Sequence, residues 1–129
     1  MGDFGTHFGI KLINSDARGT IYELQAQEKL HINFATIRKG YARGGHSHQH
    51  QEGLFVITGK IECHKGTIDK ERVVTVDAGS TIFTMPMEPH YILALEDSVF
   101  VELRPDAASY FFEDYEPFRS IVRRLAEKG

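Results

Sequence analysis

The residues of this sequence best suited to chemistry are three histidines and one glutamate. His46 and His48 are separated by one residue, Glu52 follows four positions later, and His90 comes after a further apolar stretch. In an extended segment His46 and His48 share a face, because side chains two positions apart point the same way. Imidazoles converging with a carboxylate suit one divalent transition metal (Zn, Fe, Mn, Ni or Co), with positions left for water or substrate. We therefore predict that these four side chains bind one such metal.

The alternative for residues 46–52 is a solvated polar loop that happens to contain histidines. The next segment, residues 53–58, argues against a solvated loop, because its continuous apolar character is typical of a strand buried on both faces. A carboxylate at the head of such a strand needs a partner, since an unpaired buried charge is costly. Glu52 is therefore interpreted as a ligand. His90 follows the turn formed by residues 86–89, which contains two prolines and can direct one side chain inward.

The other histidines and the single cysteine have weaker patterns. His50 has three open interpretations: a solvent-facing residue, a partner that orients a metal ligand, or a substrate contact. His7, His31 and His64 lack partners at ligand spacing, so we expect structural roles for them. Cys63 lies beside His64, and adjacent strand residues point to opposite faces, so His64 cannot activate the thiol. Cys63 is expected to pack in the core.

The elements that must position these residues are short β-rich runs separated by glycine, proline and polar clusters. Strands are predicted at residues 20–24, 32–38, 53–58, 61–64, 72–76, 81–85, 91–95 and 99–103. Their spacing suits an antiparallel sandwich or barrel, so the predicted fold class is all-β. Residues 58–60 and 77–80, each with a central glycine, are predicted as hairpin turns.

One helix is predicted at residues 114–128, where Phe118, Ile121, Val122 and Leu125 recur at helical spacing. Asp114 is expected to cap its start, and the helix to cover one open side of the barrel. The aromatic segment before it, residues 110–115, would be costly to expose, so we expect it to pack on the barrel or on a second subunit. A homodimer is predicted, because twofold homo-oligomers are the commonest kind.

The composition limits the remaining function classes. A chain of 129 residues with 41% hydrophobic composition is expected to form one domain, residues 1–129. Its charge of −3 comes from interspersed acidic and basic residues without a basic stripe, so no nucleic-acid partner is expected. No apolar run approaches the roughly 18 residues that a membrane span needs. With one cysteine and no signal segment, the chain is expected to be cytoplasmic.

The spacing of the metal-site residues resembles the first signature of the cupin superfamily, with every position present: Gly40, His46, His48, Glu52 and Gly59. Gly79, Pro86 and His90 resemble the second signature, although Glu88 stands where a glycine is usual and Ala94 replaces the usual asparagine. The resemblance covers roughly residues 15–104. It implies a double-stranded β-helix, also called an RmlC-like jelly roll, with the metal inside the barrel.

A narrower resemblance connects two segments to the sugar-nucleotide cupins. Residues 16–23 resemble the first segment of the dTDP-4-dehydrorhamnose 3,5-epimerases and dTDP-4-keto-6-deoxyglucose 3,4-ketoisomerases. Residues 43–48 are similar to the Arg-Gly-x-His-x-His motif of the ketoisomerases. The resemblance implies that an arginine holds substrate phosphates and that histidines transfer protons. Arg43 and Arg18 are accordingly expected to bind substrate, together with Glu102.

A keto-sugar isomerase removes a proton next to a carbonyl and stabilises the resulting enediolate. A ring nitrogen that binds a metal cannot also be the base, so His46 and His48 are ligands or catalysts but not both. Glu52 and His90 favour the role of ligands, which leaves the pocket wall to supply the base. The wall residues considered are Glu23, His31, Glu102, His50, Tyr22 and Tyr91, of which the last three are taken as the catalytic candidates.

Three functions are consistent with this site. The first is a metal-dependent isomerase or epimerase acting on a sugar or related small carbonyl compound. The second is a non-haem metal dioxygenase, in which Fe²⁺ binds O₂ at the open positions. The third is a cupin that binds a small ligand without turnover. In each case the expected partner is a small molecule.

Overall fold

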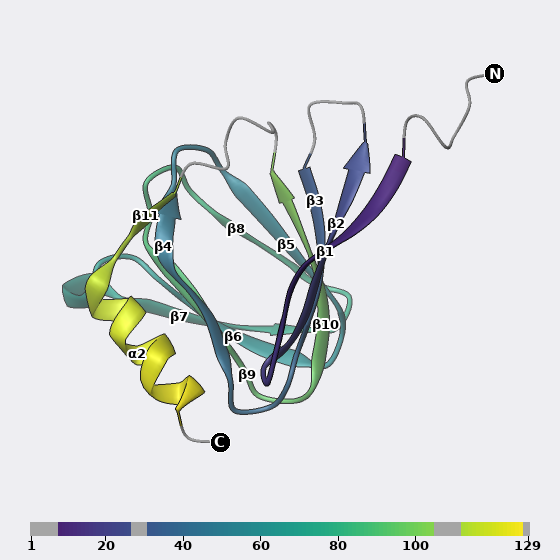
Figure 1. Ribbon diagram of the computed structural model, residues 1–129. Coiled ribbons are helices and arrows are strands. Elements are labelled where there is room, and N and C mark those ends of the chain that lie inside the picture. The colour runs from purple at the N-terminus through teal and green to yellow at the C-terminus, as the bar shows by residue number, and fades with distance from the viewer. Residues whose placement is uncertain (1–7, 27–30, 105–111, 128–129) are drawn as a thin grey trace.

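The computed structural model describes residues 8–26, 31–104 and 112–127, and within them the chain is almost entirely β-structure. Two antiparallel sheets face each other and enclose the core (Figure 1). The six-stranded sheet has the order β1 (Phe8–Asp16), β2 (Gly19–Ala26), β3 (His31–Ile37), β10 (Ser98–Arg104), β5 (Glu52–Thr58) and β8 (Thr81–Thr84). The five-stranded sheet has the order β11 (Phe112–Asp114), β4 (Ala42–His48), β9 (His90–Ala94), β6 (Lys60–Lys65) and β7 (Arg72–Asp77). This arrangement confirms the predicted all-β jelly roll.

The core lies between the inner faces of the two sheets, where side chains from both interdigitate. Its largest fully buried members include Phe100 and Ile37 from the six-stranded sheet and Ile61 from the five-stranded sheet. Cys63 belongs to the same cluster and is 1% exposed, as predicted for a packing residue. Burial raises the pKa of its thiol to about 11, so the group stays protonated at neutral pH.

The two predicted hairpin turns are wrong. Gly59 connects β5 to β6, but β5 pairs with β10 and β8, whereas β6 pairs with β7 and β9. Residues 77–80 likewise join β7 of one sheet to β8 of the other. A glycine turn reverses the chain in both cases, and its local sequence does not reveal whether the next strand pairs with the last one. In this fold both turns are corners at which the chain changes sheets.

Three strands are missing from the predicted list: β1, β4 and β11. For β4, only an extended segment containing the first two histidines of the metal site was expected. In β1 the apolar residues Phe8, Ile10 and Leu12 alternate with Gly9 and Lys11, so a strand pattern was present and was missed. This strand extends the barrel to the N-terminal side of the expected start near residue 15. β11 has only three residues, which is too short for a periodic pattern.

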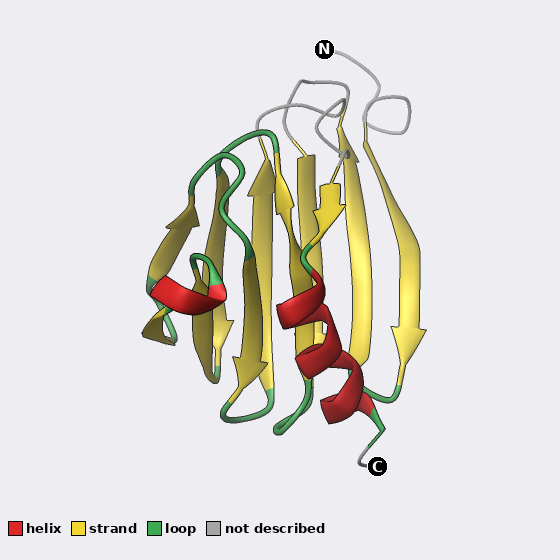
Figure 2. Ribbon diagram, turned by 90° about the vertical axis from the view of Figure 1, so that its left-hand side faces the viewer, coloured by secondary structure: helices red, strands yellow, loops and turns green. Residues whose placement is uncertain are grey.

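The predicted helix is present as α2 (Glu116–Ala126). It begins two residues later than expected, because Asp114 is still part of β11 and the N-cap position is Tyr115. The helix packs on the outer face of the five-stranded sheet, over β4 and β9 (Figure 2). Phe118 and Val122 form a buried cluster there with Ala42 and Tyr91. Tyr115 packs edge-on against Phe118, whereas residues 110 and 111 of the aromatic segment lie outside the described residues.

A membrane-spanning segment requires more length and more apolar character than any helix in the described ranges has.

A β-bulge in β4 decides which side chains reach the barrel interior. The register between β4 and β9 shifts between Gly44 and His46, which adds one residue to β4. Gly44 and Gly45 carry it with φ angles of +109° and +90°, a conformation in which a side chain is strained. In a regular strand Arg43 and His46 would point to opposite faces. The extra residue places both on the inner face.

The bulge also allows α2 to approach closely. A Cβ atom at Gly45 would lie 2.8 Å from the Arg119 Cα, and the Gly45 carbonyl accepts a 2.8 Å hydrogen bond from the Tyr115 backbone N–H. We expect Gly45→Ala to lower the free energy of unfolding by about 2–5 kcal/mol. About 1–2 kcal/mol comes from the left-handed backbone and about 1–3 kcal/mol from overpacking against a helix backbone that cannot rotate away.

Gly79→Ala is the matched control for this prediction, because Gly79 has a φ of +88° but nothing within 4 Å of its added Cβ. Only the backbone strain applies there, so its loss should be about 1–2 kcal/mol. Urea unfolding curves measure both values. Equal losses in the two variants would contradict the close approach of α2 to the bulge.

Candidate metal centre

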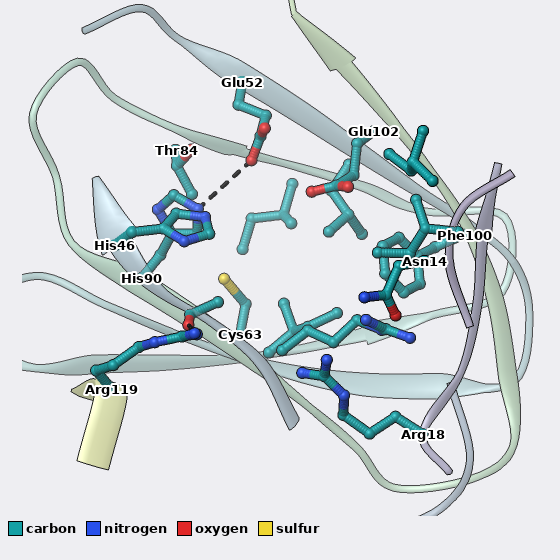
Figure 3. Close-up of a pocket in the computed structure, with 17 residues that line it drawn as sticks. Asn14, Arg18, His46, Glu52, Cys63, Thr84, His90, Phe100, Glu102 and Arg119 are labelled. Carbon is teal, nitrogen blue, oxygen red and sulfur yellow. Dashed lines mark hydrogen bonds and ion pairs between the residues drawn. The ribbon is translucent and has the colours of Figure 1, made fainter. Parts of the chain in front are cut away.

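A cavity of about 480 Å³ lies inside the barrel between the two sheets (Figure 3). Its apolar wall includes Ile21, Leu54 and Ile92. The polar groups that line it are Asn14, Arg18, Arg43, His46, Glu52, Thr84, His90, Glu102 and Arg119. The cavity therefore combines an apolar surface with a few convergent polar side chains, which is typical of a small-molecule site.

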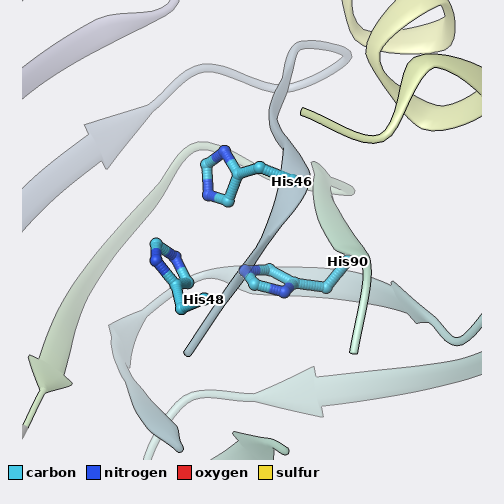
Figure 4. A group of neighbouring side chains, drawn as sticks. All are labelled: His46, His48 and His90. Atoms are coloured by element: carbon cyan, nitrogen blue, oxygen red, sulfur yellow. The ribbon is translucent and has the colours of Figure 1, made fainter. Parts of the chain in front are cut away.

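His46, His48 and His90 form one group in this interior (Figure 4). One ring nitrogen of each lies within 4.8 Å of those of the others, and the ring centroids are 4.7 to 5.4 Å apart. His46 and His48 come from β4, and His90 is the residue of β9 that pairs with His46. The predicted convergence of the three imidazoles is confirmed, and the group can hold one divalent metal ion.

The protonation of His46 suits this role, whereas the pKa of His90 is raised, because burial would lower it but the hydrogen bond and the charge of Glu52 outweigh burial. Burial, followed by the neighbouring His90 and His48, lowers the pKa of His46 to about 3, so its ring is a neutral donor at pH 7. His90 Nδ1 lies 3.1 Å from the Glu88 carbonyl oxygen, which fixes a proton on that nitrogen and turns Nε2 toward the site. The donor set therefore fits a cation that prefers imidazole ligands.

Glu52 lies beside the three histidines. Its carboxylate oxygens are 3.4 Å from His90 Nε2 and 3.5 Å from His48 Nε2, and Arg104 Nη1 donates a 3.1 Å hydrogen bond to it. Burial alone would raise the pKa of Glu52, but the hydrogen bond from His90 and the charges of His90, His48 and Arg104 lower it to about 2. Glu52 is thus an ionised carboxylate within reach of the group. Its role as the fourth ligand stays a prediction.

Arg104 was missed by the sequence reasoning. It lies on β10, is 6% exposed, and supplies the buried charge that offsets Glu52. The alternation of β10 was the available signal, because Glu102 and Arg104 share the inner face with buried Phe100. Two charged residues on an apolar inner face indicate partners inside the barrel.

Glu102 is a second carboxyl group in the cavity, directed inward from the same wall as Glu52 (Figure 3). Burial raises its pKa to about 7, and the nearby negative charge of Glu52 adds to the effect. A carboxyl with this pKa can accept or release a proton at neutral pH. The sequence analysis assigned Glu102 to substrate binding, and its position on the cavity wall is compatible with either role.

Arg18 and Arg43 form a side of the cavity that we call the arginine side. Arg18 is held by Asp16 through a 2.6 Å contact between Nη2 and Oδ2, and Arg43 Nη2 lies 3.7 Å from Asp16 Oδ1. Arg43 is only 7% exposed, yet its Nε and Nη2 make no hydrogen bond to any described residue. Buried donors without acceptors are costly and uncommon, so this guanidinium group is suited to an acceptor from a ligand.

Helix α2 contributes Arg119 to the same cavity, a residue that the sequence reasoning did not identify. Arg119 Nη1 donates a 3.0 Å hydrogen bond to the Gly44 carbonyl of the bulge. The helix therefore covers the sheet and also supplies part of the site. Its charged face gave no signal in the sequence, because arginines on an exposed helix face are common.

The three residues taken as catalytic candidates do not line the cavity. His50 is exposed in the turn between β4 and β5, and Tyr22 is 40% exposed on the outer face of β2. Tyr91 is buried beneath α2 on the outer face of β9, where it stacks on His64. The strand parity of Tyr91 is opposite to that of His90, so these two side chains cannot serve the same interior.

The remaining histidines and Glu23 also lie apart from the cavity. Glu23 and His31 pair with each other at 3.3 Å, and neither is among the lining residues. His64 has the structural role expected of it, because its ring contacts Glu62 at 2.7 Å and also contacts Glu71. His7 lies outside the described residues.

Comparison with solved structures shows the same fold in several proteins. Bacillus subtilis oxalate decarboxylase, described with Mn(II) centres, superposes with a TM-score of 0.69 at 21% identity, over 92% of this chain and 35% of the other. Hydroxypropylphosphonic acid epoxidase from S. wedmorenis gives 0.64 at 15% identity, over 74% and 55%. The capsular polysaccharide assembling protein CapF from Staphylococcus aureus gives 0.63 at 19% identity, over 76% and 33%.

This chain thus spans between 33% and 55% of the length of these three proteins. No protein-family model and no curated protein matches the sequence. At these identities the likeness establishes the cupin jelly roll, and the narrower resemblance to the sugar-nucleotide branch has weaker support.

Substitution of the histidines tests the metal centre. We expect the protein to bind one Mn²⁺ per chain in isothermal titration calorimetry. His48→Ala and His90→Ala should each weaken binding by more than about 100-fold, because even loss of an outer partner of a ligand costs about 10–100-fold. His50→Ala and His64→Ala are matched controls outside the group and should bind as the unmodified protein does. An equal loss in the controls would contradict this assignment of ligands.

Proposed function

We propose that this cupin-fold chain is a metal-dependent isomerase or epimerase acting on a small carbonyl compound, such as a sugar, that carries an anionic group. The observation that carries the proposal is the content of one cavity. Three imidazoles able to hold a divalent cation, a carboxyl with a pKa of about 7, and a buried guanidinium with unsatisfied donors all line or adjoin it. These are the groups that proton transfer next to a carbonyl requires.

The anionic group would be bound by the arginine side of the cavity. Arg43 offers buried donors, and Arg18, which shares Asp16 with it, adds positive charge on the same side. Guanidinium groups bind phosphate and carboxylate through paired hydrogen bonds, which orient a ligand as well as attract it. An anion held there would place the rest of the molecule against the apolar wall and toward the histidines (Figure 3).

The proton would be transferred by Glu102. When deprotonated it can accept a proton from the carbon next to the substrate carbonyl, and the electron pair of that C–H bond then forms the double bond of an enediolate. Return of the proton to the former carbonyl carbon, with the hydroxyl proton of the deprotonated carbon passing to the former carbonyl oxygen, completes an isomerisation. Protonation of the original carbon on its opposite face by a second donor, such as water, completes an epimerisation. A divalent cation held by the three histidines would supply positive charge beside the carbonyl oxygen.

The role of Glu102 is supported by two features of its surroundings. Its pKa lies close to neutral pH, where a group both accepts and releases protons efficiently. Glu52, the other carboxyl on this wall, is engaged by Arg104 and by the histidines and has a pKa of about 2, so it is a poor base. The two carboxyl groups therefore differ in protonation, which is the usual sign of divided roles.

Exchange of substrate hydrogen with solvent tests the reaction class. The metal-loaded protein is incubated in D₂O with a panel of phosphorylated and nucleotide-linked keto sugars, and deuterium at the carbon next to the carbonyl is followed by NMR. We expect incorporation with at least one compound. Glu102→Gln should lower its rate by about 10²–10⁴-fold. Glu96→Gln, at an exposed turn, is the matched control and should leave the rate unchanged.

Two outcomes would replace this proposal. Oxygen consumption by the Fe²⁺-loaded protein, without deuterium incorporation, would favour the oxygenase. Binding of a compound without exchange or oxygen uptake would favour the ligand-binding alternative. Neither of these functions includes the proton transfer assigned to Glu102, so Glu102→Gln would have no such step to slow.

The pH dependence of the exchange rate gives a further prediction. Because Glu102 must be deprotonated to accept the proton and its pKa is raised to about 7, the rate should increase as the pH rises through about 7. In Glu102→Gln the residual rate should lose this inflection. A profile with the same inflection in both proteins would assign the titrating base to another group.

A substitution of Arg43 separates binding from chemistry. Arg43→Gln should raise KM for an anionic substrate while kcat changes less, because the guanidinium acts on the anionic group and not on the reacting carbon. Arg38→Gln, on an exposed residue, is the matched control. An unchanged KM in steady-state assays of Arg43→Gln would contradict the anion-binding role.

A further inference from the structure

Asn33 is a buried polar residue that the proposed reaction does not use. It lies on β3, is 5% exposed, and shares the inner face of the six-stranded sheet with Ala35 and Ile37. Its Oδ1 accepts no hydrogen bond from any residue that the structure describes. A buried acceptor without a donor is costly and uncommon, so this oxygen indicates that a donor for it lies close by.

The pairing of the strands defines which side chains can reach Asn33. Glu23 on β2 and Glu102 on β10 lie directly opposite it, one on each side. The three side chains share one face of the sheet, because directly paired residues of antiparallel strands point the same way and have Cβ atoms about 4.5–5.5 Å apart. Either carboxyl group can therefore approach the Asn33 amide by rotation of its own side chain.

The other groups near Asn33 are engaged elsewhere. Glu23 pairs with His31, whose Nδ1 lies 3.3 Å from its carboxylate. Arg104, the diagonal neighbour of Asn33 on β10, directs Nη1 to Glu52. A molecule in the cavity does not reach Asn33 either, because Asn33 is not among the residues that line it. The second paired carboxyl group, on β10, remains as the neighbour that can supply a proton.

We propose that Asn33 is a positioning residue for Glu102, whose protonated carboxyl group donates a hydrogen bond to Asn33 Oδ1. A carboxyl group has two oxygens, so one can face the cavity while the other meets the amide. The amide oxygen favours the protonated form over the carboxylate, because it accepts a bond from the first and repels the second. The contact itself rests on the positions of the two residues, and only its use in catalysis rests on the proposed function.

The charged groups around Glu102 agree with this assignment. Burial and the negative charge of Glu52 raise the pKa of Glu102 to about 7, against the opposing charges of Arg104, His90 and Arg43. Glu102 therefore carries a proton at mildly acidic pH, and a protonated carboxyl group has one O–H donor. The fold thus places a potential donor directly opposite an acceptor that lacks one.

Infrared spectroscopy tests the contact. Difference spectra of the protein with Mn²⁺ present, between mildly acidic and alkaline pH, should contain a C=O stretching band of protonated Glu102, and Glu102→Gln should abolish it. Asn33→Leu has nearly the same shape but no acceptor. It should move the band to higher frequency, because a carboxyl group whose O–H loses its acceptor has a stronger C=O bond. Asn33→Thr keeps an oxygen at this position and should return the band toward its original frequency.

Leu54→Val is the matched control, because Leu54 pairs with Glu102 on its other side, on β5, and offers no acceptor. This substitution changes the packing around the carboxyl group and should leave the band where it is. Absence of a Glu102 band at every pH would overturn the proposal. So would a band that stays in place in Asn33→Leu, or one that moves equally in Leu54→Val. Circular dichroism checks that each variant folds, and if Asn33→Leu does not, Asn33→Val compared with Asn33→Thr removes the acceptor at constant shape.

The measurement needs no substrate, so its result is separate from that of the proposed function. Deuterium incorporation into a substrate, with a band that does not move in Asn33→Leu, would support the isomerase and reject the contact. A band that moves as expected, in a protein that exchanges no substrate hydrogen, would support the contact and reject the reaction class.

Discussion

The site depends on one departure from regular strand geometry, the bulge at Gly44 and Gly45. A regular β4 would alternate its side chains, so either Arg43 or the pair of histidines would face the solvent side of the sheet. The extra residue lets Arg43 and the two histidines all face the interior, and it pairs His46 with His90. Both positions have φ angles of about +100°, which a glycine adopts at little cost. The same glycines allow α2 to lie close enough to bring Arg119 to the cavity.

Inside the barrel, a buried charge is offset by neighbouring groups of opposite charge. Glu52 is matched by Arg104 and by the histidines. Two groups remain less completely matched: Glu102, whose pKa rises to about 7, and Arg43, whose buried donors lack acceptors among the described residues. A buried polar group that the protein does not satisfy is costly to stability, which makes it informative about ligands. These two groups face one cavity together with the metal centre.

The sequence predicted the features that depend on residue type and short-range spacing. The convergence of His46, His48 and His90, the all-β class and the C-terminal helix all follow from local patterns. The errors concern orientation. Tyr91 was given a catalytic role although its parity places it on the outer face, under α2, a packing that only the tertiary structure reveals. Arg119 was missed because a charged residue on a helix usually faces solvent. Arg104 was missed although the alternation of β10 places it on the inner face with Phe100.

The central claim is that three imidazoles inside the barrel hold one divalent cation. A crystal structure of the protein grown with Zn²⁺, with diffraction data collected on both sides of the zinc absorption edge, tests it most directly. The account predicts one strong anomalous peak per chain, about 2.1 Å from a ring nitrogen of each of His46, His48 and His90. A strong peak elsewhere, such as at His64, or no peak among the three imidazoles, would contradict it.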